Sequence, residues 1–366
     1  MQIKYTVLER LGGGGQAEVY RGLSESLEGF KRVVALKRVL PNIASNPRFV
    51  AMFLDEARLS LFLQHANIVQ VFDVSKAADG SYFLAMEYVD GCDLKALIDY
   101  EIRNGRSANI ALVLHIVIEC CKGLHYAHTA EHPETRVPLR IVHRDISPPN
   151  VMLSKNGEVK VVDFGLAKAN SQLEVTDEGV VKGKFSYLAP ETALGLPIDA
   201  RADVFALGIL LWEMLTERRL FVGETPHDTI ELIRRARIPS IVAINPNIDN
   251  ELEGIVRKAL ARNREDRYET AADFGEALTT YLFAKGLKAT SRDVALAVRA
   301  VQAARARRAS PGAALADALV KDEVHKLTQD VADEIATTPR RGSQTLSGID
   351  GLVDTKDWAA DLLGDD

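Results

Sequence analysis

The sequence predicts an α+β fold of two lobes, in which a small β-rich lobe precedes a larger, mainly helical lobe and an α-helical C-terminal tail. Two observations support this prediction. In the first ninety residues, β-branched and aromatic runs are separated by glycine, Asp-Gly or polar turns, as between short strands. From Asp93 onward, apolar residues recur every four residues, which is typical of helices packed on a core.

The β-rich region is predicted to contain strands and a single helix. Strands are expected at residues 5–8, 17–21, 33–40, 68–74 and 82–88. The helix is expected at residues 49–63, because four apolar side chains recur there at helical spacing: Phe49, Phe53, Ala57 and Leu61.

The helical region shows the same spacing twice, and a short hairpin interrupts it. One helix carries Leu112, Ile116, Cys120 and Leu124, and a later one carries Leu207, Leu211 and Leu215. The hairpin is predicted at residues 151–153 and 159–162, because Asn156-Gly157 is a favoured two-residue turn.

The sequence after residue 285 changes character. Thr290 and Asp293 resemble a helix-capping pair ahead of an apolar stripe, and Ser310-Pro311 can begin a second helix. Polar residues then lead into an acidic end with a few apolar side chains. We therefore divide the chain into a domain at residues 1–285, with lobes at 1–87 and 88–285, a helical extension at 286–336 and a flexible acidic tail at 337–366.

The composition is that of an ordinary soluble protein. The 366 residues are 47% hydrophobic and 26% charged, and 51 Asp and Glu outnumber 45 Lys and Arg, so no global basic field is present to bind nucleic acid. Only three cysteines occur, which fits a reducing compartment. We find neither an N-terminal signal peptide nor an apolar run near the roughly 20 residues that span a bilayer. We expect a cytoplasmic protein without a transmembrane segment.

A glycine-rich loop between the first two strands indicates phosphate binding. Residues 11–15 read Leu-Gly-Gly-Gly-Gly, and glycines let backbone N–H groups approach a phosphate closely. Lys37 on the third strand could neutralise the phosphates, and Glu56 on the intervening helix is placed to hold that lysine. Alone, the four glycines are as often a flexible turn, and a solvated lysine would be the favoured interpretation of Lys37 if no other motif matched.

Further motifs follow in order. They are His143-Arg144-Asp145 with Asn150, then Asp163-Phe164-Gly165, then Gly183 to Ala189-Pro190-Glu191. Over residues 5–285 the sequence resembles the eukaryotic-like (Hanks-type) protein kinase family, and in particular its bacterial serine/threonine members. The resemblance implies a bilobal kinase fold and transfer of the ATP γ-phosphate to Ser or Thr hydroxyls of protein substrates in signalling.

The resemblance also implies roles for individual residues. Asp145 would accept the proton of the acceptor hydroxyl, and Lys37, paired with Glu56, would contact the phosphates. Asn150 and Asp163 would bind Mg²⁺, with Mn²⁺ as an alternative. The residues expected to surround ATP are Leu11, Gly12, Gly13, Gly14, Gly15, Val19, Ala35, Lys37, Glu87, Val89, Asp93 and Met152. Glu191 and Arg267 would form a buried ion pair, and Asp203 would brace the catalytic loop.

Two positions depart from the family pattern. Family members that act on Ser or Thr normally carry Lys two positions after the catalytic Asp, where this chain has Ser147, and Thr where it has Lys184. We hypothesise that the ammonium group has moved from position 147 to Lys184, which would join the catalytic residues. The alternative is a solvated Lys184 and a slower site. The same departure weakens the Ser/Thr assignment, because tyrosine-specific members also lack that lysine.

Regulation and competing functions complete the prediction. Thr176, in an acidic stretch, is the expected autophosphorylation site, with Arg144 as the group that would bind its phosphate. His125, His128 and His132 are interpreted as helix-end residues rather than a metal cluster. The helices between Arg292 and Ala336 are expected to pack on the large lobe or to form a homodimer through their apolar stripes, and the acidic end is expected to be a docking or autoinhibitory motif. A pseudokinase scaffold and a small-molecule kinase are the competing functions; the complete motif set argues against both.

Overall fold

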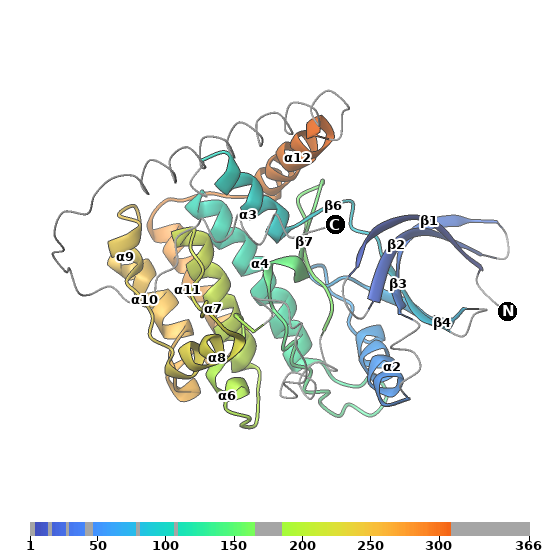
Figure 1. Cartoon of the computed structure of the whole chain (residues 1–366), viewed down its shortest axis with the longest axis horizontal. Helices are drawn as coiled ribbons and strands as arrows, with labels where there is room; N and C mark the ends of the chain where they lie inside the picture. Colours follow the sequence, from blue (N-terminus) through green and yellow to red (C-terminus); the bar gives the residue numbers. More distant parts are fainter. Residues whose placement is uncertain are drawn as a thin grey trace, which may run out of the picture.

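The computed structural model describes residues 4–13, 17–26, 29–40, 47–77, 81–105, 109–164 and 185–308. It has two lobes, as predicted: an N-lobe built on a β-sheet and a larger helical C-lobe (Figure 1). The chain passes between them after β5, which ends at Glu87. The predicted helix at residues 310–336 and the acidic tail lie outside the described residues.

The N-lobe sheet has the strand order β1-β2-β3-β5-β4, and each neighbouring pair is antiparallel. Its strands are β1 Lys4–Gly13, β2 Ala17–Glu25, β3 Lys31–Val39, β4 Val71–Lys76 and β5 Tyr82–Glu87. β3 is the central strand, and its Val34, Ala35 and Leu36 are all buried. Because consecutive side chains of a strand point to opposite faces, this run supplies apolar side chains to both faces of the sheet.

One face of this sheet packs against α2, residues Pro47–Leu61. Phe53 and Ala57 of α2 are buried in one apolar cluster with Ala35, Val71 and Met86 of the sheet. A second, smaller apolar cluster is separate from the first and contains the buried side chains of Val34, Leu36 and Ala85. The helix therefore fixes one face of the strand that carries Lys37.

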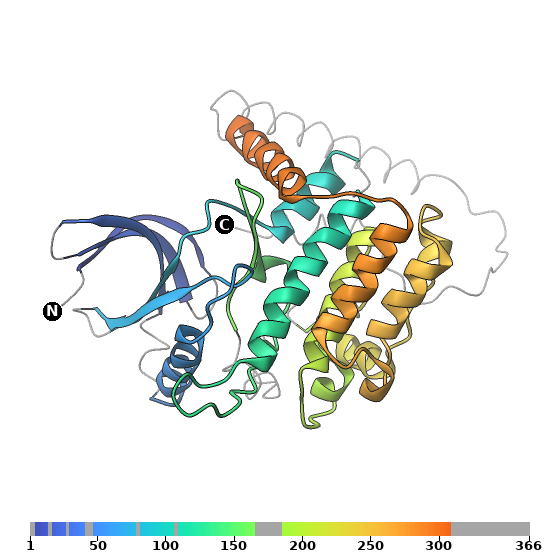
Figure 2. The same ribbon diagram turned by 180° about the vertical axis from the view of Figure 1, so that it is seen from behind.

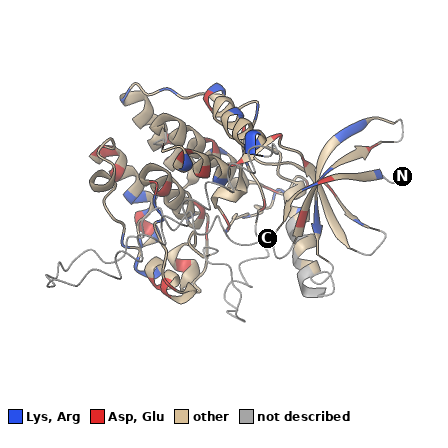
Figure 3. Cartoon of the chain, turned by 45° about the horizontal axis from the view of Figure 1, so that its top comes forward, with Lys and Arg blue, Asp and Glu red and all other residues tan. Residues whose placement is uncertain are grey.

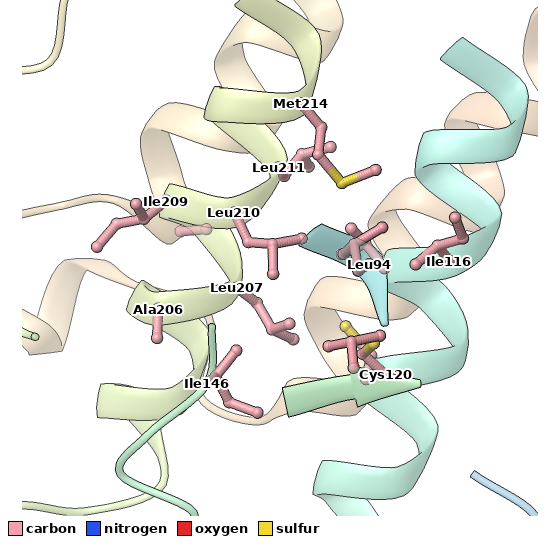
Figure 4. Close-up of a cluster of buried hydrophobic side chains, with 14 of the residues drawn as sticks. Leu94, Ile116, Cys120, Ile146, Ala206, Leu207, Ile209, Leu210, Leu211 and Met214 are labelled. Atoms are coloured by element: carbon pink, nitrogen blue, oxygen red, sulfur yellow. The ribbon is translucent and has the colours of Figure 1, made fainter. Parts of the chain in front are cut away.

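The C-lobe is built around α4 and α7. Its helices are α3 Leu94–Arg103, α4 Ile110–Thr129, α6 Pro190–Ala193, α7 Arg201–Thr216, α8 Pro226–Arg235, α9 Ile241–Ile244, α10 Asn250–Ala259, α11 Ala271–Ala284 and α12 Ser291–Arg308. Short 3₁₀ turns occupy Pro148–Asn150 (η1) and Arg264–Asp266 (η2). Nearly all of α7 is buried, and Figure 4 shows its side chains gathered with Leu94, Ile116, Cys120 and Ile146.

Among the described residues, α4 is long and apolar enough to cross a membrane by length and composition alone. This corrects the expectation that no apolar run approaches that length. The helix packs against α7 and α11, and most of its apolar side chains belong to the C-lobe core. Burial in a core explains its composition without a membrane.

A second, three-stranded sheet lies where the lobes meet. It contains β6 Gly91–Asp93, β7 Val151–Ser154 and β8 Val159–Val161 in that order. The predicted hairpin corresponds to β7 and β8, and Gly157 in its turn has φ of 93°, a conformation that favours glycine. β6 was not predicted from the sequence; it pairs Asp93 with Met152 of β7.

Charged residues are spread over both lobes. Figure 3 shows Lys and Arg interspersed with Asp and Glu across the described part of the chain. This distribution agrees with the small formal net charge of −6.

Candidate active site between the lobes

The loop His143–Asn150 is held in place by the buried carboxylate of Asp203 on α7. Asp203 Oδ2 accepts from the His143 backbone N at 2.8 Å, and Oδ1 accepts from the Arg144 backbone N at 2.8 Å. Burial alone would raise the pKa of Asp203, but the hydrogen bonds that its carboxylate forms with His128 and with the backbone N of Arg144 outweigh burial, and the pKa is lowered. The predicted bracing of this loop by Asp203 is confirmed.

The His143 ring connects this loop to the end of β8. Its Nε2 lies 2.9 Å from the Val162 carbonyl oxygen, and its Nδ1 lies 3.2 Å from the Asp145 backbone N. A neutral ring with the proton on Nε2 satisfies both contacts, donating at one nitrogen and accepting at the other. Burial lowers the pKa of His143, which favours that neutral form.

Asp145 and Asn150 lie side by side. The Asn150 side-chain Nδ2 donates to Asp145 Oδ2 at 2.9 Å and to the Asp145 carbonyl oxygen at 2.7 Å. Both hydrogen bonds use the nitrogen, so the amide oxygen is the end of Asn150 that a cation could bind. Asp145 is thus oriented by a neutral donor within its own loop.

Lys37 and Asp163 form an ion pair across the two lobes. Lys37 Nζ on β3 lies 2.8 Å from Asp163 Oδ1, just after β8. Asp163 has φ of 61°, unusual for a residue other than glycine, and its neighbour Val162 donates its backbone N to the Asn150 carbonyl oxygen at 3.0 Å. Lys37, Asp145, Asn150 and Asp163 therefore converge on one place. The side chain of Glu56, the expected partner of Lys37, lies outside the described residues.

Several residues that were predicted to contact ATP lie on the N-lobe side of the Lys37–Asp163 pair. Ala35 is buried in the N-lobe cluster with Met86, and Val19 and Val89 pack against the same cluster. The Glu87 backbone N donates to the Gln70 carbonyl oxygen at 2.8 Å. The Glu87 side chain pairs with Lys160 at 3.0 Å.

The remaining predicted nucleotide residues lie on β1, β6 and β7. Leu11, Gly12 and Gly13 end strand β1, whereas Gly14 and Gly15 lie outside the described residues. Asp93 Oδ1 accepts from the Ala96 backbone N at 2.7 Å and so caps α3. Met152 sits opposite Asp93 on β7.

The donor set suits a hard divalent cation completed by a nucleotide. Asp163 and Asn150 offer carboxylate and amide oxygens, the ligands that Mg²⁺ prefers. No cluster of three or more His, Cys, Asp or Glu that could hold a metal ion occurs among the described residues. Two protein ligands are sufficient where phosphate oxygens and water fill the other positions, as Mg²⁺ commonly requires.

Comparison with known proteins identifies the family. The sequence model for the protein kinase domain matches residues 5–278. The chain belongs to the protein kinase family. Members of this family use ATP and a divalent metal ion and act on protein substrates.

Individual relatives carry different substrate names. The chain is 43% identical over 278 residues to the tyrosine-protein kinase MasK of Myxococcus xanthus, which aligns 76% of this chain with 43% of MasK. It is 36% identical over 270 residues to the serine/threonine-protein kinase PrkC of Bacillus subtilis, with 74% and 39% covered. The chain thus spans about two-fifths of the length of these curated relatives.

A solved structure agrees with the fold. The crystal structure of the Mycobacterium tuberculosis PknI kinase domain superimposes with a TM-score of 0.58 at 27% identity. The match covers 76% of this chain and 97% of that domain.

Two carboxylates, those of Glu191 and Glu213, are buried in the C-lobe. Glu191 and Arg267 form the predicted ion pair, with both Glu191 oxygens 2.7 Å from guanidinium nitrogens. Tyr187 donates its hydroxyl to Glu213 at 2.6 Å, and burial raises the pKa of Glu213. This hydrogen bond holds the Tyr187 hydroxyl against the C-lobe core.

One supporting residue escaped the sequence analysis. His128, interpreted as a helix-end histidine, lies at the end of α4 with its Nε2 2.7 Å from Asp203 Oδ2. It therefore contacts the carboxylate that holds the catalytic loop. The spacing of His128 from the His143 motif does not reveal this contact, because α7 supplies the carboxylate from a distant part of the sequence.

Of the two positions that depart from the family pattern, the structure describes Ser147. Ser147 has an extended backbone and begins the η1 turn, two residues after Asp145. Lys184 and the expected phosphorylation site Thr176 lie outside the described residues.

Proposed function

We propose that this kinase transfers the γ-phosphoryl group of ATP to serine and threonine hydroxyls of proteins in cytoplasmic signalling. The observation that carries this proposal is the Lys37–Asp163 ion pair, which joins the two lobes beside the hydrogen-bonded Asp145 and Asn150. Phosphoryl transfer depends mainly on positioning and charge neutralisation, and these four side chains supply both.

Each residue has a distinct part in the proposal. Asp145 orients the acceptor hydroxyl and accepts its proton. Lys37 neutralises phosphate oxygens, with Glu56 as its partner, and Asp163 and Asn150 bind Mg²⁺ or Mn²⁺ through oxygen atoms. Release of Asp163 from Lys37 would free its carboxylate for the metal once ATP phosphates engage the lysine.

The nucleotide occupies the junction of the lobes in this proposal. Val19 and Ala35 cover the adenine from the N-lobe, Met152 lies beneath it, and the backbones of Glu87 and Val89 bind its edge. Asp93 binds the ribose. The glycine-rich segment covers the phosphates with Leu11, Gly12, Gly13, Gly14 and Gly15.

The acceptor class is the finer part of the proposal. The chain is 36% identical to PrkC, a protein named as a serine/threonine kinase, and this likeness favours Ser and Thr as acceptors. Ser147, which replaces the usual lysine, and the likeness to a protein named as a tyrosine kinase favour tyrosine as the second candidate.

One experiment addresses activity and acceptor together. The purified chain is incubated with radiolabelled ATP, Mg²⁺ and a generic protein substrate, and the phosphoamino acids are separated. We expect phosphoserine and phosphothreonine, and a loss of about 10²–10⁴-fold in Asp145→Asn, since the general base is removed. Phosphotyrosine alone would reassign the acceptor class. Nucleotide binding without transfer would indicate a pseudokinase.

We also propose that Lys184 replaces the ammonium group missing at Ser147. Lys184→Ala should lower kcat by about tenfold or more, because a charge near the transferred phosphate is lost. Lys182→Ala, two residues earlier, is the matched control. Equal kcat values for the two variants would leave Lys184 a solvated residue.

Activation by phosphorylation of Thr176 completes the proposal. Arg144, expected to bind that phosphate, has φ of 65° and a buried Nε without a hydrogen-bond partner among the described residues. Mass spectrometry after incubation with ATP should find phosphate on Thr176; a segment without phosphate would exclude this route.

The three cysteines are buried and unpaired, in keeping with a reducing cytoplasm.

A further inference from the structure

Helix α12 lies beyond the end of the matched kinase family region but packs on the catalytic lobe. It contacts β6, β7, α3 and α4. Figure 2 shows it lying above α3, close to the point where the chain crosses from one lobe to the other. At its start, the Asp293 carboxylate accepts from the Thr290 backbone N at 2.8 Å and from the Thr290 hydroxyl at 2.9 Å.

The contact face of α12 is part of the C-lobe core. Val294 and Val298 have no exposed surface and Val301 is 2% exposed, and all three join the cluster that includes Cys92 and Leu153. The opposite face is different, as Leu296 is 53% exposed. This burial is as complete as that of helices inside the matched region.

Helix α12 packs against the small sheet at the lobe junction. At the start, the backbone of Ser291 lies so close to Gly157 in the β7–β8 turn that any side chain at position 157 would collide with it. The helix contacts both β6 and β7, and its buried valines lie in the same apolar cluster as Cys92 of β6. The helix therefore lies against β6 and β7.

β6 and β7 carry two of the proposed nucleotide residues. Asp93 and Met152 are paired across these strands, and Gly91 approaches the Leu153 carbonyl too closely for a side chain. β6 follows directly on the segment that joins the lobes, and Asp93 also fixes the start of α3. A shift of β6 would move the ribose and adenine contacts together.

We propose that α12 is a positioning element for the nucleotide, in which Val298 and its neighbours hold β6 and β7 in the geometry that binds ATP. The catalytic unit on this proposal runs to Arg308. Val294, Val298 and Val301 are positioning residues, since they act through Asp93 and Met152 and do not touch the nucleotide. The inference rests on the proposed ATP site but not on the acceptor class.

The test compares two chemically identical substitutions in the full chain. Val298→Ala on α12 and Val256→Ala on α10 each truncate a fully buried valine of the same core. For Val298→Ala we expect the Kd of a fluorescent ATP analogue and KM for ATP to rise about fivefold, as small displacements of binding groups do. Val256→Ala should change both by less than about twofold, and KM for the protein substrate should stay constant in both.

Two further variants guard against a trivial loss of folding. Val298→Ile keeps the contact and should restore most of the nucleotide affinity, and Leu296→Ala on the exposed face should leave it unchanged. Equal weakening by Val298→Ala and Val256→Ala, or no weakening by either, would overturn the proposal. If Val298→Ala fails to fold, the milder Val301→Ala is measured in its place with the same two outcomes.

The binding measurement separates this inference from the proposed function. A chain that binds the analogue but transfers no phosphate would refute the proposed activity, and the selective effect of Val298→Ala on binding would still support the role of α12. A chain that transfers phosphate normally with unchanged KM for ATP in Val298→Ala would refute the role of α12 alone.

Discussion

The buried pair of Glu191 and Arg267 gives the sharpest quantitative prediction. Arg267 donates all five guanidinium N–H groups: two to Glu191, and one each to the carbonyl oxygens of Ala261, Arg201 and Arg262. The Arg267 side chain is 0% exposed and that of Glu191 6%. The guanidinium of Arg267 lies over the Phe205 ring, and its Cζ is 4.7 Å from the ring centroid. Both charges are therefore almost completely removed from water.

Replacing Glu191 with Gln removes the negative charge without creating a cavity. The Arg267 charge would then be buried and uncompensated, and the new amide NH₂ would face a guanidinium donor. Breaking a buried pair in this way destabilises a protein by about 3–5 kcal/mol. Since about 1 kcal/mol moves the Tm of a domain of this size by about 2–4 °C, we expect a fall of about 10 °C.

An exposed pair in the same lobe provides the control. Arg201 Nη1 lies 2.6 Å from Glu265 Oε2, but Glu265 is 61% exposed. Glu265→Gln makes the same chemical change and should destabilise by less than about 1 kcal/mol, because water already screens the pair. Urea unfolding and differential scanning calorimetry measure both variants. Equal losses from the two substitutions would refute the reasoning, because burial would then have no effect on the strength of the pair.

Three further predictions concern the catalytic loop and the core. Burial lowers the pKa of His143 below the value of about 6.5 that it has in the unfolded chain. As the pH falls below about 6.5, the unfolded chain takes up a proton at this histidine and the folded chain does not. The free energy of unfolding should therefore decrease below that pH. The slope of unfolding free energy between pH 7 and 5 should flatten in His143→Phe; an unchanged slope would contradict this. Asp203→Asn should lower kcat by more than tenfold with little change in KM for ATP, because one of the two side-chain oxygens that accept from backbone N–H groups is replaced by an NH₂ donor. Steady-state kinetics tests this, and an unchanged kcat would count against it. Tyr187→Phe should destabilise by about 1.5–3 kcal/mol in urea, as a buried carboxylate loses a hydroxyl donor; a loss below about 0.5 kcal/mol would contradict it.

The sequence predicted the two lobes and most strands because those features depend on local patterns. The five N-lobe strands and the β7–β8 hairpin correspond to runs bounded by turn residues, although β1 extends to Gly13 and β4 begins only at Val71. The Asn156-Gly157 turn was readable because its conformation is a local property of those two residues.

β6 and the role of His128 were missed for a different reason. β6 is three residues long and exists because β7 pairs with it, so its own sequence carries little strand pattern. His128 lies near Asp203 only because α4 and α7 pack together across the core. Contacts between residues 75 positions apart follow from packing and not from spacing.

Helix α12 shows the same limit at the scale of a whole element. Its cap and its apolar stripe were visible in the sequence, yet the stripe alone fits packing on the lobe, dimerisation or a free helix equally well. The choice depends on whether a complementary apolar face is already present nearby, and here β6, β7 and α3 supply one. Gly157 makes that choice specific, since the close approach of Ser291 is compatible only with the absence of a side chain at that turn. Gly157 therefore has two roles: its positive φ permits the turn, and the absence of a Cβ lets the start of α12 approach the hairpin closely. Replacement by alanine would violate both conditions, so the turn and the docking of α12 should be lost together.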